Sequence, residues 1–157
     1  MDITLDVDDW KLNCRAGGII IHNNKVLLHH NINEPYYALL GGRIKIGESS
    51  SETVKREIKE ETGKDVEITG YVATIENFFG PRSKKYHEYL FVHKVEFVKE
   101  ADIKLEETLS NIEGNDNLKY EWIDLSKLDK TDIRPAVIKD ILKSQNFPVH
   151  LVNTDLK

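Results

Sequence analysis

The sequence predicts a single α/β domain in which helices flank a mixed β-sheet, and three observations lead to this fold class. The chain has 157 residues, enough for one domain with a hydrophobic core and too few for a comfortable second one. A strongly signalled helix stands between β-rich segments, and a second helix follows the last of them. Neither an internal repeat nor a Pro/Gly/Ser linker divides the chain, so we expect one domain over 1–157 with its core at about 15–142.

The first part of the predicted sheet is a hairpin. Residues 16–21 (Ala-Gly-Gly-Ile-Ile-Ile) are typical of a buried strand, Asn23-Asn24 of a turn, and residues 25–29 of the partner strand. Residues 37–40 are predicted as a short strand that leads into a glycine-containing loop ending at Glu48.

The segment after this loop carries signals for both ends of a helix. Ser49 and Glu52 have the spacing of a capping box, in which each side chain satisfies a backbone donor at the helix start. Gly63 stands where a left-handed C-terminal cap is expected, because a residue without Cβ takes that conformation cheaply. We therefore predict a helix from about Ser50 to Thr62.

Two longer segments after the helix are rich in β-branched and aromatic residues. Residues 66–77 and 85–98 are predicted as long antiparallel strands around a turn at 80–83. Residues 119–124 form another short strand, and a proline in the first turn predicts a helix over about 134–142.

Seven charged or glycine positions within residues 42–63 stand at fixed spacings. Gly42-Arg43-Ile44-Lys45-Ile46-Gly47-Glu48 is followed by seven residues and then by Arg56-Glu57-Ile58-Lys59-Glu60-Glu61-Thr62-Gly63. This pattern resembles the Nudix box, G-x5-E-x7-R-E-U-x-E-E-x-G-U with U a bulky aliphatic residue, and departs from it only at Lys64. The resemblance implies an α/β/α sandwich and Mg²⁺-dependent hydrolysis of a nucleoside diphosphate linked to another moiety.

Three glutamates of the predicted helix are candidates for holding a cation. At about 100° per residue, Glu57, Glu60 and Glu61 fall within an arc roughly 100° wide beside the buried face. Like charges at these spacings repel one another and destabilise a helix. A bound divalent cation makes the same cluster of carboxylates favourable. By resemblance, Mg²⁺ or Mn²⁺ is bound by Glu57 and Glu61 first, Glu60 second, and the Gly42 carbonyl. Whether one glutamate instead orients or deprotonates the attacking water stays open, and the acidic pattern taken alone is also typical of a solvated helix face.

Arg56 and Glu48 are expected to face one another at the helix start. A bidentate ion pair there would hold the preceding loop against the first turn, so we predict an orienting role for both. Arg15, at the start of the first core strand, is a candidate for substrate phosphate, as an arginine is in several relatives. Arg43 and Lys45, in the loop, are further candidates. All three basic residues fit surface charges equally well.

Several glutamates outside the box are candidates for an accessory base or ligand, and the sequence does not show whether any of them has that role. Glu88 begins the second long strand and faces either the metal or solvent, because side chains alternate along a strand. The family often places an accessory base in the later loop region, where the sequence does not choose among Glu106, Glu107, Glu113 and Glu121.

Composition limits the class of partner. A formal net charge of −5 disfavours polymeric nucleic acid and still allows a small nucleotide, provided that metal and local basic residues neutralise it. Cys14 is the only cysteine, so a reducing cytoplasm without disulfides is expected. The acidic N-terminus and the lack of a long apolar run predict neither a targeting segment nor a membrane span.

We therefore expect a cytoplasmic, MutT-like Nudix pyrophosphohydrolase. Its substrate is a nucleoside triphosphate or a nucleotide sugar such as ADP-ribose, and the sequence does not decide between them. Pro81, 17 residues after Lys64, is close to a proline of many ADP-ribose hydrolases, but a turn explains it too. The alternative is a non-catalytic sensor that binds a nucleotide sugar. An isoprenoid diphosphate isomerase would need a reactive cysteine near the active site, and Cys14 is not at the position where that resemblance would put it. A homodimer is common among relatives, but the sequence does not show whether this chain forms one.

Overall fold

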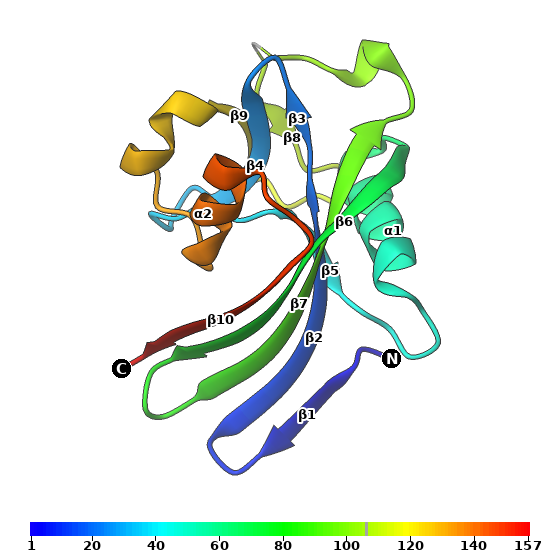
Figure 1. Ribbon diagram of the computed structural model, residues 1–157. Helices are drawn as coiled ribbons and strands as arrows, with labels where there is room; N and C mark the ends of the chain where they lie inside the picture. Colours follow the sequence, from blue (N-terminus) through cyan, green and yellow to red (C-terminus); the bar gives the residue numbers. More distant parts are fainter. Residues whose placement is uncertain (106) are drawn as a thin grey trace.

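The computed structural model describes residues 1–105 and 107–157. In this part of the chain, a six-stranded mixed sheet stands beside a four-stranded antiparallel sheet (Figure 1). The larger sheet has the order β1-β2-β7-β6-β10, with β5 pairing with β2, and the smaller sheet has the order β3-β4-β9-β8. The predicted α/β class with a mixed sheet is confirmed.

The elements have the following bounds. The larger sheet consists of β1 (Thr4–Val7), β2 (Trp10–Ile19), β5 (Leu40–Arg43), β6 (Val66–Gly80), β7 (Lys85–Phe97) and β10 (Val149–Leu156). The smaller sheet consists of β3 (Ile21–His22), β4 (Lys25–Asn31), β8 (Leu109–Ser110) and β9 (Leu118–Asp124). The helices are α1 (Ser50–Thr62) and α2 (Val137–Ser144), with 3-10 turns η1 (Glu100–Asp102) and η2 (Leu125–Lys130).

Helix α1 has the predicted bounds. Ser49 and Glu52 form a capping box with both hydrogen bonds present, and Gly63 has a φ of 74° and donates its N–H to the Lys59 carbonyl. Because the sequence signals lie within the helix itself, they suffice to place it.

The two helices pack on opposite sides of the larger sheet (Figure 1). Val54 and Ile58 of α1 are fully buried, and a Cβ at Gly18 would lie 3.1 Å from the Val54 side chain, so glycine permits the close approach of helix and strand. Ile138 and Ile141 of α2 belong to a second hydrophobic cluster on the other side. The sheet is thereby enclosed between two cores, as an α/β/α arrangement requires.

Several strands differ from the predictions. The segment 16–21 is divided at Ile20, so that β2 joins the larger sheet and only Ile21–His22 forms the hairpin with β4. The strand predicted at 37–40 is shifted to Leu40–Arg43 and includes both glycines. A Cβ at Gly41 would lie 2.0 Å from the Ala16 carbonyl oxygen, so glycine lets β5 pair closely with β2.

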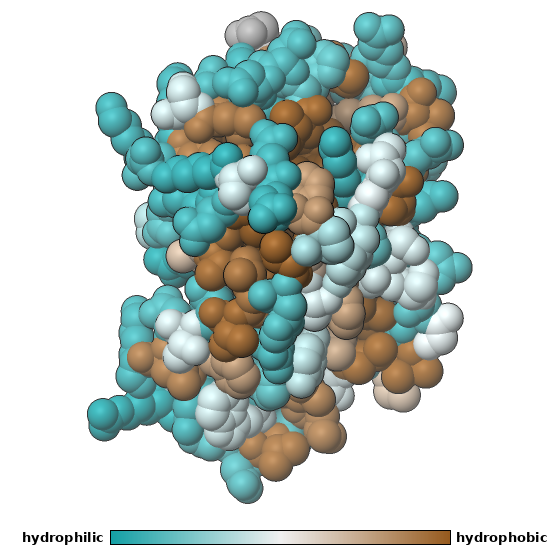
Figure 2. Space-filling model, in the orientation of Figure 1, coloured by the Kyte–Doolittle hydropathy of each residue, from teal (hydrophilic) through white to brown (hydrophobic). Residues whose placement is uncertain are grey.

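Among the described residues, three strands were not predicted at all. They are β1, which pairs with β2, β8, which pairs with β9, and β10, which runs parallel to β6. Of these, β1 and β10 lie outside the range 15–142 that we expected for the core. The second helix begins after Pro135 rather than at it, and ends at Ser144. In the view of Figure 2, apolar side chains (brown) are interspersed with hydrophilic ones (teal).

Candidate active site

The loop before α1 is fixed to the helix by Arg56. Its Nε and Nη2 donate to the two carboxylate oxygens of Glu48 at 2.7 and 2.9 Å. Glu48 also accepts from the Thr53 hydroxyl at 2.8 Å and from the Lys45 N–H at 3.2 Å. Hydrogen bonding to Arg56 lowers the pKa of Glu48 to about 2. The fork geometry expected for this pair is present.

The same guanidinium also contacts the next acidic residues. Nη1 of Arg56 donates to Glu57 at 2.7 Å and to Glu60 at 3.2 Å. The Glu57 carboxylate lies against Gly42, because a Cβ at position 42 would be only 2.3 Å from Glu57 Cδ. Glycine at this position therefore brings the backbone of β5 directly beside a carboxylate.

Glu61 is the buried acid of the helix, with 8% of its surface exposed. It accepts a hydrogen bond from the Tyr120 hydroxyl at 3.2 Å, and that hydroxyl accepts one from Asn111 Nδ2 at 2.9 Å. Burial, and then the neighbouring charge of Glu57, raise the pKa of Glu61 to about 7. Burial also raises the pKa of Tyr120. Glu61 therefore holds an ionisable carboxylate inside the protein, next to a second one.

The structure holds the three glutamates through two different partners: Glu57 and Glu60 share the guanidinium of Arg56, whereas Glu61 is bound by Tyr120. Within residues 1–105 and 107–157, no three His, Cys, Asp or Glu side chains are grouped as a cation site. Arg56 binds Glu60 on the exposed side of the helix, while Tyr120 binds Glu61 on the buried side. The donors fit Mg²⁺ or Mn²⁺ in kind, because Glu57 and Glu61 offer carboxylate oxygens and the charge of Glu57 acts on Glu61.

The three predicted basic residues lie in different surroundings. Arg15 is partly buried on β2, its charge acts on Glu61, and it makes no hydrogen bond or ion pair with another described residue. Arg43 lies 3.6 Å from the carboxylate of Asp2 and is exposed. Lys45 follows β5 and engages Glu48 through its backbone. Arg15 is thus the basic residue that the fold brings to the buried glutamate.

Glu113 is an accessory candidate whose charge acts on Glu61. Its charge raises the pKa of both Glu61 and Tyr120, and the N–H of the neighbouring Ile112 donates to the Glu61 carbonyl at 2.9 Å. The segment around residue 112 therefore lies at the C-terminal end of α1, beside the buried acid.

The other candidates lie elsewhere. Glu121 is bound by His30 at 2.9 Å on the strand face opposite to Tyr120, because neighbouring side chains of β9 alternate. Glu107 is an exposed residue paired with Lys104 at 3.4 Å, and Glu106 lies outside the described residues.

Sequence reasoning missed Tyr120, which binds Glu61, and Asn111, which binds the Tyr120 hydroxyl. A tyrosine within a predicted strand is usually a core residue, and only the pairing of β9 in the folded chain places this one beside α1. Glu88, the remaining candidate, is 6% exposed and hydrogen-bonded to Asn13 and Asn77.

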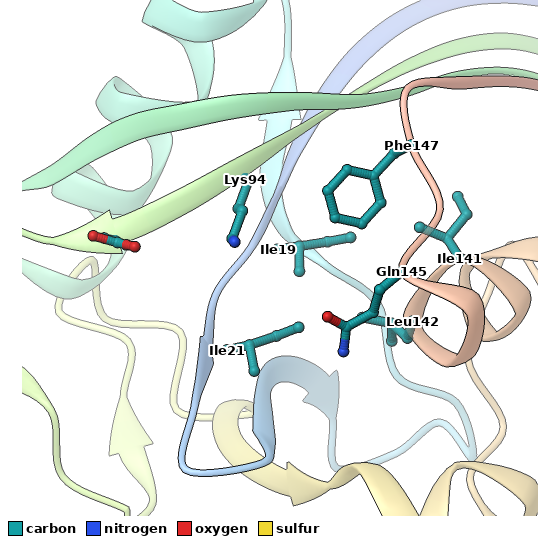
Figure 3. Close-up of a pocket in the computed structure, with 8 residues that line it drawn as sticks. Ile19, Ile21, Lys94, Ile141, Leu142, Gln145 and Phe147 are labelled. Atoms are coloured by element: carbon teal, nitrogen blue, oxygen red, sulfur yellow. The ribbon is translucent and has the colours of Figure 1, made fainter.

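A separate pocket of about 150 Å³ lies on the α2 side of the sheet. Figure 3 shows the side chains that line it, and the walls are both apolar and polar: they comprise Ile19, Ile21, Ile141, Leu142 and Phe147 together with Lys94, Glu96 and Gln145. None of the residues that line it belongs to the box, so it is distinct from the candidate active site.

The model of the NUDIX domain family matches residues 12–143. The chain belongs to the NUDIX family. The family match and the relative described next confirm the predicted enzyme class, a Nudix pyrophosphohydrolase. A relative from Methanocaldococcus jannaschii, named ADP-ribose pyrophosphatase, is 32% identical over 133 residues, which cover 82% of this chain and 72% of the relative.

Solved structures of Nudix proteins support the fold. A MutT Nudix hydrolase from Burkholderia pseudomallei gives a TM-score of 0.63 at 18% identity, covering 86% of this chain and 98% of the other. A MutT protein from Bacillus halodurans gives 0.60 at 22% identity, covering 83% and 80%. An ADP-ribose pyrophosphatase from Streptococcus suis gives 0.57 at 16% identity, covering 88% and 98%. Among the described residues of this Nudix chain, no helix is long and apolar enough to cross a membrane.

Proposed function

We propose that this Nudix enzyme hydrolyses the diphosphate of a nucleotide sugar, with ADP-ribose as the first substrate to test, in a reaction that needs Mg²⁺ or Mn²⁺. The observation that carries the proposal is the buried Glu61 beside Glu57, which lies directly against Gly42. A buried carboxylate next to a second carboxylate destabilises the fold, and the same pair is suited to binding a cation. The relative named ADP-ribose pyrophosphatase supports this substrate over a nucleoside triphosphate.

Glu57, Glu61 and the Gly42 carbonyl would hold the cation, and Glu60 is a secondary ligand. When bound, the cation neutralises phosphate charge and makes water easier to deprotonate. Arg56 keeps Glu57 in place and, through Glu48, fixes the loop that carries Lys45.

Arg15 is the residue we assign to the substrate diphosphate, because it is partly buried, near Glu61 and without a partner among the residues described. Glu113 is the residue we assign to accept a proton from the attacking water, because its charge is felt at Glu61. Attack of water at one phosphorus of ADP-ribose breaks the phosphoanhydride and yields AMP and ribose 5-phosphate. Arg43 and Lys45 are weaker candidates for phosphate contact. The expected cytoplasmic location, homodimer and absence of a polymeric nucleic acid partner stay predictions.

The test is release of AMP from ADP-ribose by the purified protein with Mg²⁺ or Mn²⁺, against a panel of nucleoside triphosphates and dinucleotides. The wild type should be active with metal and inactive with EDTA. Glu57→Gln should lose turnover by orders of magnitude. Glu60→Gln is the matched control, since it makes the same chemical change one turn away on the exposed side and should lose far less. A wild type that binds ADP-ribose and releases nothing would instead be the nucleotide-sugar sensor, and the proposal would be rejected.

A further inference from the structure

A row of polar side chains crosses the larger sheet beyond the active site. Strand pairing places Asn13 of β2 opposite Glu88 of β7, Glu88 opposite Asn77 of β6, and Asn77 opposite Asn153 of β10. The amides of Asn13 and Asn77 donate to the Glu88 carboxylate at 3.1 and 3.2 Å, and Asn153 donates to Asn77 Oδ1 at 2.9 Å. Asn13 is 2% and Glu88 6% exposed. A buried carboxylate is thus held by neutral amides.

The charge of Glu88 decides the direction of the neighbouring amide. Nδ2 of Asn13 must face the carboxylate, so Oδ1 points away from it, and this buried oxygen has no hydrogen-bond partner among the described residues. Thr4, opposite Asn13 on β1, donates its hydroxyl to the Leu12 carbonyl instead. A buried acceptor without a donor is costly. A carboxylate can accept about four hydrogen bonds, so the row contains more hydrogen-bond acceptors than its own donors can satisfy.

The row adjoins the residue that we assign to the diphosphate. Asn13 and Arg15 are two residues apart on β2, so their side chains lie on the same face, roughly 6.5 Å apart along the strand. Arg15 in turn acts on Glu61. Figure 1 shows that β2, β7, β6 and β10 extend at one end beyond both α1 and α2. Arg15 therefore shares a strand face with Asn13, which pairs with Glu88, and its charge also acts on Glu61.

We propose that Glu88 and Asn13 bind hydroxyl groups of a ribose in the substrate while Arg15 holds the adjoining diphosphate. This inference rests on the proposed function. A ribose supplies hydroxyl donors, which the row lacks, and an acidic side chain binds ribose hydroxyls in the same manner in dinucleotide-binding folds. A phosphate at the row would be repelled by Glu88. ADP-ribose has a ribose on each side of its diphosphate, and the experiment separates the two.

The test compares three substrates: ADP-ribose, its analogue with 2′-deoxyadenosine, and the ethyl ester of ADP, which lacks the distal ribose. In the wild type, one of the two analogues should have a kcat/KM about tenfold to hundredfold below that of ADP-ribose, the size expected for hydrogen bonds to a charged group. The analogue affected identifies the ribose. Glu88→Gln should cleave ADP-ribose with a kcat/KM close to that of the affected analogue and should no longer discriminate between them.

The matched control is Glu76→Gln, a carboxylate on the opposite face of β6 that is bound by His150 at 2.8 Å. This variant should discriminate like the wild type. Thermal unfolding checks that Glu88→Gln folds, and Asn13→Ala, which removes the unpaired acceptor and keeps Glu88, gives a second test and should lose part of the discrimination.

Three results would overturn the inference. They are a wild type that cleaves all three substrates equally, discrimination retained in both Glu88→Gln and Asn13→Ala, or a loss of discrimination in Glu76→Gln as large as in Glu88→Gln. If the wild type cleaves none of the three with metal, the proposed function has failed separately. Calorimetry with ADP-ribose then tests the row: weaker binding by Glu88→Gln supports it and equal affinity rejects it.

Discussion

Glu61→Gln is expected to stabilise the metal-free protein at alkaline pH while it disables the site. Glu61 has a pKa of about 7 in the folded protein against an ordinary value of 4.5, chiefly because it is buried. Its folded pKa is raised, so ionisation is penalised in the native state: the cost is absent below pH 4.5 and complete above about pH 7. The difference between the two pKa values corresponds to about 3 kcal/mol. Glutamine carries no charge and keeps an acceptor for the Tyr120 hydroxyl.

The assay is unfolding in EDTA at pH 5 and pH 8, by urea and by heat. At pH 8 the free energy of unfolding of Glu61→Gln should exceed that of the wild type by about 3 kcal/mol, or roughly 6–12 °C in Tm for a chain of this size. At pH 5 the two proteins should differ little. Added Mg²⁺ should stabilise the wild type by linkage and should stabilise the variant much less.

Glu60→Gln is the control for net charge, because it removes a carboxylate from the exposed side of the same helix. The reasoning would be refuted if the difference in free energy of unfolding between the wild type and Glu61→Gln were the same at pH 5 and pH 8. Glu61 would then titrate as if it were in water. If Glu60→Gln stabilised the protein at pH 8 as much as Glu61→Gln does, the effect would come from the overall charge of the protein rather than from the burial of Glu61.

Three further predictions concern the same site. Glu48→Gln should lower turnover less than Glu57→Gln, because Glu48 acts through Arg56, and initial rates in the reverse order would reject that ranking. Gly42→Ala should lower kcat by about a hundredfold with little change in Tm, because its Cβ displaces the Glu57 carboxylate, and unchanged kcat would show that the carboxylate does not act from this position. Tyr120→Phe should lower the free energy of unfolding by about 1–3 kcal/mol and weaken Mn²⁺ binding in calorimetry, since Asn111 and Glu61 both lose a partner, whereas unchanged Mn²⁺ affinity would leave the tyrosine a purely structural role.

Helix α1 was predicted from end to end because its determinants are local. Ser49, Glu52 and Gly63 act on backbone groups within four residues of themselves, so no knowledge of the fold is needed. The fork between Arg56 and Glu48 was predicted for the same reason, since both residues belong to one loop and one helical turn.

The positions of the carboxylates could not be predicted in the same way. The helical period fixes where Glu60 and Glu61 leave the helix but not which partner each one finds. Glu60 is bound by Arg56 from its own helix, whereas Glu61 is bound by Tyr120, which is 59 residues away in the chain. Strand β10 was missed for a related reason, because its parallel partner β6 is far away in sequence and its outward side chains are polar or exposed.

The charges of the site explain why these acids are tolerated. One guanidinium, that of Arg56, binds Glu48, Glu57 and Glu60, whereas Glu61 is bound by the hydroxyl of Tyr120. The carboxylate without a guanidinium partner is the buried one, and its pKa is raised first by burial and then by the neighbouring charge of Glu57. The hydrophobic clusters on both sides of the sheet stabilise the fold without help from this site, so the helix can retain an unfavourable acid. A cation bound at Glu61 removes the cost of ionising this buried carboxylate, and the removal of that cost contributes favourably to the free energy of cation binding. Replacing Glu61 should therefore raise the stability of the metal-free protein and lower its affinity for metal.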